Sequence, residues 1–265
     1  NNRPMVDLKN VKKLDPRTDA VILEVSENRR NTTPDDPDSD DFFYPDTMAN
    51  GLPNLNGLWV QGGDTAPMPS FLLNEDPIFT PAGQAIQDTI QAINDPQYIR
   101  CEPAGLVRQV GFTPHPVRIT QYDDRVTFQY EEYAGERVVY LDDRDYGNYD
   151  ENERYLQGRY KAYYEGDELV IESDLLTSGW TEIFGNVTSD QTTVVERYSR
   201  GFDEKWGPYA HLSMTITDPV NLAEPWEIFW DKYYTVKGFT GTRRDNVQLD
   251  YEMLPVECQL PLTAN

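Results

Sequence analysis

The chain has 265 residues, and 23 Lys and Arg against 46 Asp and Glu give it a formal net charge of −23. So acidic a surface repels nucleic acid and anionic membranes, which makes both poor partners. No run of about 18 apolar residues occurs, which argues against membrane insertion. The length suffices for one large β domain with extensions.

The first 56 residues predict an N-terminal extension. Residues 29–56 are rich in Pro, Asp and Asn, which is typical of a long irregular loop. A short strand is expected at residues 20–25. We therefore expect the extension at residues 1–56 and one barrel domain at residues 57–260.

Residues 57–60 predict the first barrel strand, and a helix is expected to begin at Thr80, with Thr80 as N-cap and Pro81 in the first turn. An apolar stripe extends this helix to about residue 94. We expect the helix to pack on the barrel or to plug it. The stripe consists of Ala82, Ile86, Ile90 and Ile93. Residues 101–116 are expected to be irregular.

Residues 117–141 predict three antiparallel strands with turns at residues 123–124 and 134–135. Two-residue turns place Ile119 opposite Phe128 and Glu132 opposite Arg137. Alternation of side chains then gives an inner face that is apolar in the middle. Its polar ends are Gln121 on one side and the Glu132–Arg137 pair on the other.

Further strands are expected at residues 155–173, as a hairpin turning at 166–167, and at 192–200, 210–217, 226–236 and 249–253. Eight to ten antiparallel strands with one short helix predict an all-β fold. We expect a closed antiparallel up-and-down barrel of calycin (lipocalin-like) type. Such a barrel can hold one small ligand.

Several motifs resemble those of a set of secreted, mostly uncharacterised bacterial proteins that look like calycin barrels. They are RCEPAGLVR, PHPVRITQ, YYEGDELVIES, VVERY and TDPVNLAEPW, and the match covers roughly residues 55–258. The resemblance implies a barrel and a periplasmic or secreted location, and it implies no activity. Here Tyr160 and Ala162 replace a Ser-x-Gly, and Tyr164 replaces a Trp, which would reshape a pocket.

The candidate catalytic residues are His115, Glu132 and Arg137. Arg137 could bind a carboxylate, phenolate or enolate, with Glu132 or Glu131 as base. The alternative is a cross-strand ion pair. His115, between two prolines, is either a general base at the barrel mouth or an exposed loop imidazole.

Six inward-facing positions predict a tyrosine-rich cavity, and plain core filling is the alternative. They are Gln121, Tyr130, Tyr160, Tyr164, Trp226 and Trp230. Whichever of Glu196 and Arg197 faces inward needs a partner, which Arg108 could supply for Glu196.

No metal or cofactor is expected, because the chain has no CxxC, His/Cys cluster, GxSxG or Gly-rich phosphate loop. Cys101 and Cys258 form either a disulfide or two buried thiols.

Three functions fit these patterns. The first is a secreted or periplasmic barrel that binds a small apolar or aromatic molecule in the tyrosine-rich cavity, alone or as an oligomer. The second is a cofactor-independent lyase, isomerase or cyclase that works by acid–base chemistry in that cavity. The third is a packed structural or interaction module.

Overall fold

The computed structural model describes residues 46–60, 74–91, 94–97, 102–113, 115–131, 135–182, 185–204 and 207–234. Nine strands form one antiparallel sheet: β1 (Gly57–Val60), β2 (Val117–Gln121), β3 (Arg125–Tyr130), β4 (Glu136–Tyr140), β5 (Arg159–Glu165), β6 (Glu168–Asp174), β9 (Thr193–Asp203), β10 (Gly207–Thr217) and β11 (Trp226–Tyr234). A separate hairpin pairs β7 (Gly179–Trp180) with β8 (Val187–Thr188).

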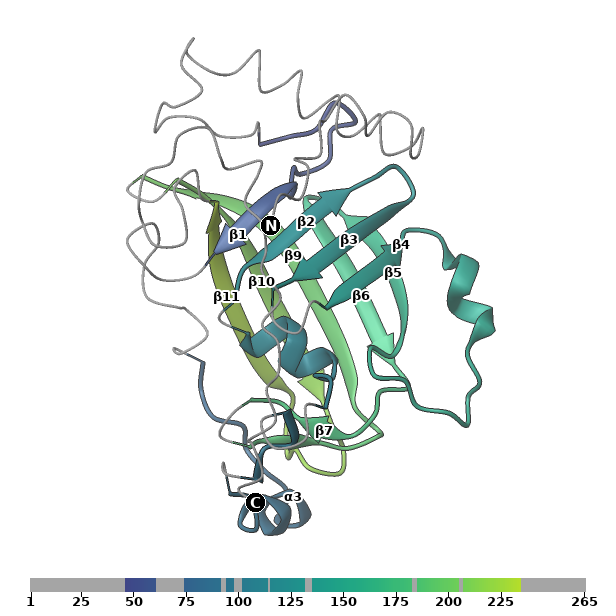
Figure 1. Ribbon diagram of the computed structural model, residues 1–265, viewed down its shortest axis with the longest axis vertical. Helices are drawn as coiled ribbons and strands as arrows, with labels where there is room; N and C mark the ends of the chain where they lie inside the picture. Colours follow the sequence, from purple (N-terminus) through teal and green to yellow (C-terminus); the bar gives the residue numbers. More distant parts are fainter. Residues whose placement is uncertain are drawn as a thin grey trace, which may run out of the picture.

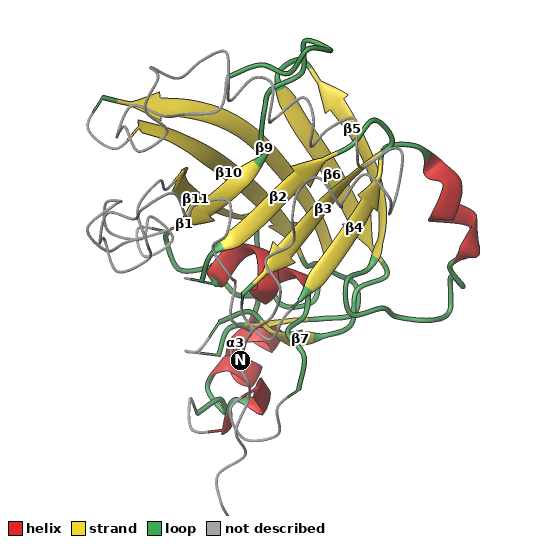
Figure 2. Cartoon of the chain, turned by 45° about the horizontal axis from the view of Figure 1, so that its top comes forward, coloured by secondary structure: helices red, strands yellow, loops and turns green. Residues whose placement is uncertain are grey.

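The sheet curves into a nearly closed barrel, as Figures 1 and 2 show. Its strand order is β4-β3-β2-β1-β11-β10-β9-β6-β5, so the first strand pairs with the last. Strands that follow one another in sequence pair in the sheet, apart from the β7–β8 excursion and the step from β4 to β5, which form its two edges. This order confirms the expected antiparallel β architecture.

A tyrosine side chain joins the two edge strands β4 and β5. The Tyr160 hydroxyl accepts a hydrogen bond from the backbone N–H of Tyr140 at 3.1 Å and donates one to the carbonyl of Val138 at 3.2 Å. Tyr160 therefore satisfies edge groups of β4 that a neighbouring strand would otherwise satisfy.

The predicted register is confirmed in two hairpins and wrong in a third. Ile119 lies opposite Phe128, and Tyr160 lies opposite Ser173, as expected. Arg137, however, lies opposite Phe128 rather than Glu132. The turn is longer than two residues, because the Tyr130 N–H already bonds to the carbonyl of Gly135 at 2.7 Å. The register moves by an even number of residues, so Arg137 stays on the inner face.

Large aromatic side chains fill the middle of the barrel. Trp59, Phe128, Tyr198 and Trp230 are each at most 2% exposed. The Tyr198 ring lies 5.1 Å from Phe128 and 6.0 Å from Trp230, centroid to centroid. The inward-facing side chains form one continuous hydrophobic cluster. Along β10 buried and half-buried positions alternate as the sequence predicts.

Helix α3 (Pro81–Gln87) begins where the sequence predicts but ends earlier. The Thr80 Oγ1 accepts from the Gly83 N–H at 3.0 Å, and Pro81 occupies the first turn. The predicted apolar stripe is wrong: Ile86 is 42% exposed. Gly83 is the buried residue of this helix, because its Cα lies against the backbone of Asn221 where a Cβ would collide.

A different helix, η4 (Arg108–Phe112), lies across the lower opening of the barrel in Figure 1. The Trp230 Nε1–H donates to the carbonyl of Val110 at 2.8 Å, and the buried Lys232 ammonium donates to the carbonyl of Thr113 at 3.1 Å. The expectation of irregular structure is thus wrong for these residues. A five-residue π-helix offers too few turns for an apolar period.

Several expectations lie outside the described residues. These are the strands at 20–25 and 249–253, the acidic loop before residue 46, Glu132, and the pairing of Cys101 with Cys258. Within the described ranges, no helix combines the length and apolar character needed to cross a membrane.

Candidate functional site

Gln121 and Tyr164 meet inside the barrel near the start of β1. The Gln121 Nε2 donates to the Tyr164 hydroxyl at 2.7 Å and to the carbonyl of Pro53 at 3.0 Å. Its Oε1 accepts from the Leu55 N–H at 2.6 Å. Both ends of this buried amide are thus occupied, so Gln121 fastens the segment before β1 to the barrel.

Arg137 lies inside the barrel and pairs with Glu196 of β9. Its Nη1 lies 2.8 Å from each oxygen of the Glu196 carboxylate, and its Nη2 lies 3.3 Å from the Ser173 Oγ. The Arg137 and Glu196 side chains are 4% and 0% exposed. Burial lowers the pKa of Arg137, but the charge of Glu196 more than reverses this, so the guanidinium stays charged.

Two tyrosines complete this group. The Tyr198 hydroxyl donates to Glu196 Oε2 at 2.7 Å. Burial raises the pKa of Tyr198 and of Tyr130, and the charge of Arg137 opposes the rise at both. Both hydroxyls are therefore neutral at pH 7. We call Tyr130, Arg137, Ser173, Glu196 and Tyr198 the interior polar cluster. Its one positive charge is matched by Glu196.

His115 lies apart from this cluster. Its side chain is 33% exposed, and its Nδ1 lies 3.8 Å from the Glu131 carboxylate. Its carbonyl accepts from the Lys232 ammonium at 2.8 Å. The imidazole thus stands at the surface beside the start of β2, next to Glu131.

The two tryptophans of the predicted cavity lie at the end of the barrel that η4 covers. Trp230 binds the carbonyl of Val110 in η4, as described above. The Trp226 Nε1–H donates to the carbonyl of Glu75 at 2.8 Å, and its ring lies 5.2 Å from Phe112. Both indoles therefore use their polar atoms on the backbone.

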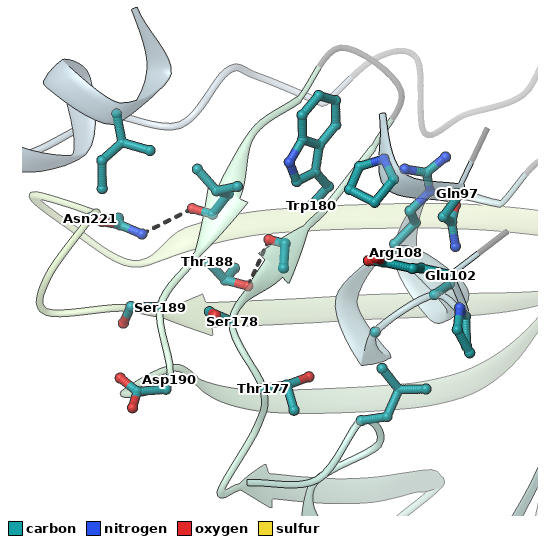
Figure 3. A pocket seen from close by; sticks show the side chains of 18 of the residues that line it. Gln97, Glu102, Arg108, Thr177, Ser178, Trp180, Thr188, Ser189, Asp190 and Asn221 are labelled. Atoms are coloured by element: carbon teal, nitrogen blue, oxygen red, sulfur yellow. Dashed lines mark hydrogen bonds between the residues drawn. The ribbon is translucent and has the colours of Figure 1, made fainter. Parts of the chain in front are cut away.

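A groove of about 830 Å³ lies beside η4, between the β7–β8 hairpin and α3. We call it the end groove; Figure 3 shows it. Its walls come from residues 102–105, from η4, from β7 and β8, and from the turn after β10. None of the nine residues predicted from the sequence lines it. The lining is mostly apolar.

A buried ion pair borders the groove. The Arg108 Nη1 and Nη2 bind the two oxygens of Asp95 at 3.0 and 2.9 Å. The Arg108 and Asp95 side chains are 5% and 0% exposed. The expectation that Arg108 pairs with Glu196 is therefore wrong. Asp95 is close in sequence and takes both nitrogens.

Trp180 of β7 lies opposite Val187 of β8 and lines the groove. Gly185, in the loop between them, has φ +96°, which strongly favours glycine. A Cβ there would lie 3.3 Å from the Trp180 ring and would collide with Ile90. The absence of a side chain at Gly185 thus makes room for Ile90, with the Trp180 ring packed beside it.

Asp218 organises the opposite wall. Its Oδ1 accepts from the Ser189 hydroxyl at 2.7 Å and from the Val220 N–H at 3.0 Å, and its Oδ2 accepts from the Ser189 N–H at 2.7 Å. The Asn221 N–H bonds to the same carboxylate at 3.2 Å. Asp218 therefore joins the end of β8 to the turn after β10.

Few sequence patterns point to this groove. Asp218 and Pro219 follow the predicted strand at residues 210–217 and indicate only its end, and no motif contains Trp180. The motifs RCEPAGLVR and TDPVNLAEPW do carry Arg108, Asp218 and Asn221. A cluster of short motifs from distant segments was thus the available signal.

Within the described ranges, no group of three or more His, Cys, Asp or Glu side chains is placed to hold a metal ion. Comparison of the chain with protein-family models, with curated proteins and with solved structures found no match.

Proposed function

We propose that this protein binds a small, mainly apolar molecule in the end groove. The volume of about 830 Å³ carries the proposal. Small-molecule sites typically enclose about 300–1,000 Å³ and are mostly apolar with a few polar groups. The end groove combines Ile86, Leu156 and Val187 with the polar side chains of Thr188 and Asn221.

The barrel interior supports this choice by contrast. Its side chains pack in one cluster, and Arg137 is already paired with Glu196. A ligand anion there would compete with a buried carboxylate. Of the candidate bases for the acid–base alternative, His115 is partly exposed and lies 3.8 Å from the Glu131 carboxylate, apart from the interior polar cluster.

We also propose that the fold belongs with the calycin barrels. The up-and-down order closed by β1 and β11 supports this assignment. A periplasmic or secreted location is proposed with it, on the resemblance of the motifs alone.

A groove-filling variant tests the proposed function with the neutral apolar dye N-phenyl-1-naphthylamine. Gly179 lines the groove, and a Cβ there would meet no atom within 4 Å. Gly147 in η5 (Asp143–Asn148) is equally open and does not line the groove. We expect Gly179→Trp to weaken dye binding about tenfold or more, with Gly147→Trp as the control within about twofold.

Dye fluorescence titrations measure both affinities, and urea unfolding shows that both variants fold. Equal weakening by the two variants, or unchanged binding in Gly179→Trp, would contradict the proposal. Failure of the unmodified protein to bind the dye would contradict it as well.

A further inference from the structure

The charges that line the end groove restrict the class of ligand. Resting on the proposed function, we propose that the groove takes an amphipathic cation: an amine that carries an apolar or aromatic body. Three features of the described lining support this: Arg108 is already paired, Asp190 carries an exposed carboxylate, and Asn221 holds a buried acceptor.

Among the described residues that line the groove, Arg108 is the one with a positive charge. Both of its terminal nitrogens bind Asp95, which is fully buried. A ligand carboxylate or phosphate would have to displace Asp95 and leave a buried charge without its partner, which is strongly unfavourable. The described part of the lining therefore offers no available cation to a ligand anion.

An acidic residue, Asp190, also lines the groove. The Asp190 side chain is 59% exposed, and its carboxylate lies 4.0 Å from the Arg154 Nε, the outer limit of an ion pair. The whole chain adds a formal charge of −23. Both the lining and the surrounding field thus favour a positive ligand.

Asn221 lines the groove and holds a buried hydrogen-bond acceptor. Its Nδ2 donates to the carbonyl of Val187 at 3.2 Å, which makes Oδ1 the remaining acceptor. The side chain is 3% exposed, and Oδ1 has no hydrogen-bond partner among the described residues. A buried acceptor without a donor is costly, and an ammonium N–H is the strongest donor a small ligand can bring.

Trp180 provides the surface for the apolar body. Its half-buried indole lines the groove together with Leu156 and Val187. In Figure 3 the Trp180 ring and the Asn221 side chain stand on either side of Thr188. An indole face attracts cations as well as apolar groups. An aromatic amine satisfies this wall, and its ammonium reaches the buried acceptor when the Asn221 side chain turns toward the groove.

Three probes of matched shape test the class of ligand: 2-phenylethylamine, 2-phenylethanol and 3-phenylpropionate. Isothermal titration at pH 7 and low ionic strength compares their affinities for the unmodified protein. We expect the amine to bind about tenfold or more tightly than the alcohol, and the carboxylate to bind more weakly than the alcohol.

Two variants locate the preference. Asn221→Leu should lower the affinity for the amine to that for the alcohol. Because Asn221 is buried, exposed Asp190→Asn serves as a second variant, expected to weaken amine binding about threefold and leave the alcohol unchanged. Asp143→Asn, on exposed η5, is the matched control and should change neither.

The results separate the two proposals. Equal binding of amine and alcohol, or tighter binding of the carboxylate, would overturn the amine proposal while leaving the groove as a binding site. Absence of binding by all three probes, together with the dye, would overturn the proposed function itself.

Discussion

The barrel interior and the end groove each contain an arginine bound to a buried carboxylate, and the surroundings of the two pairs differ. Arg137 and Glu196 are enclosed by tyrosines and join β4 to β9, strands that are not neighbours in the sheet. Arg108 and Asp95 border an open groove. The same pairing thus braces a packed core in one place and forms a charge-neutral wall in the other. The presence of a buried ion pair therefore does not by itself locate a binding site.

Of the changes considered, removal of the Arg137 side chain should lower the free energy of unfolding most. Arg137→Ala leaves Glu196 buried without its partner, which costs about 3–5 kcal/mol in the free energy of unfolding. Urea denaturation measures the loss. Arg197→Ala is the matched control: Arg197 lies next to Glu196 on β9 but faces outward to Glu165 and Glu168, so about 0–1 kcal/mol is expected.

The double replacement of Arg137 by Met and Glu196 by Leu sharpens this test. Removal of both charges should recover most of the stability, because no buried charge remains. A double variant as unstable as Arg137→Ala would mean that the cavity, and not the unpaired carboxylate, causes the loss.

Alkaline pH should lower the free energy of unfolding through the two buried tyrosines of the barrel interior. Burial raises the pKa of Tyr130 and Tyr198 above the usual value of 10.0. The unfolded chain loses these protons near pH 10 while the folded protein retains them, so stability is intact below pH 10 and falls above it. Each tyrosine contributes about 1.4 kcal/mol per pH unit in that window.

Urea denaturation at pH 9, 10 and 11 measures this slope, and Tyr130→Phe should reduce it. An equal slope in Tyr130→Phe would show that Tyr130 ionises in the folded protein as readily as in the unfolded chain.

Gly185→Ala should disturb the groove more than the interior. The new Cβ collides with Ile90, presses on Trp180 and requires a positive φ, at a cost of about 1–3 kcal/mol. Binding of N-phenyl-1-naphthylamine should weaken as Trp180 moves. Gly51, also at positive φ but with no atom near a Cβ, provides a control for the backbone cost alone.

The smallest effect is expected at the edge of the sheet. Tyr160→Phe removes the bonds from its hydroxyl to β4 and should cost about 1 kcal/mol. Amide hydrogen exchange should accelerate at Tyr140, whose N–H loses its acceptor. Unchanged exchange there would indicate that β4 and β5 are held by other contacts.

Much of the barrel could be predicted because strand alternation is local. Ile119 opposite Phe128 and Tyr160 opposite Ser173 follow from tight turns within a few residues. The predicted length of the turn before β4 was wrong, because a dipeptide pattern does not determine the length of a loop. The prediction that Arg137 points inward is nevertheless confirmed. A register shift by an even number of residues leaves each side chain on the same face of the sheet.

The sites were harder to predict, because they depend on contacts between distant residues. The sequence indicated that an inward-facing Glu196 needs a partner, but Arg137 is 59 residues away, and only the curvature of the sheet brings the two together. The end groove joins Arg108, Trp180 and Asn221 from three segments. No local period links them, so composition and alternation could not reveal it.

The indole N–H resonances of Trp180 and Trp230 test the central claim directly, because one lines the groove and the other is in the core. A ¹H–¹⁵N spectrum recorded during titration with 2-phenylethylamine reports both in one experiment, with Trp180→Phe and Trp230→Phe to assign the peaks. We predict that the Trp180 resonance shifts with saturation while the Trp230 resonance stays in place. A shift of Trp230 alone would place the ligand inside the barrel and contradict the end groove as the binding site.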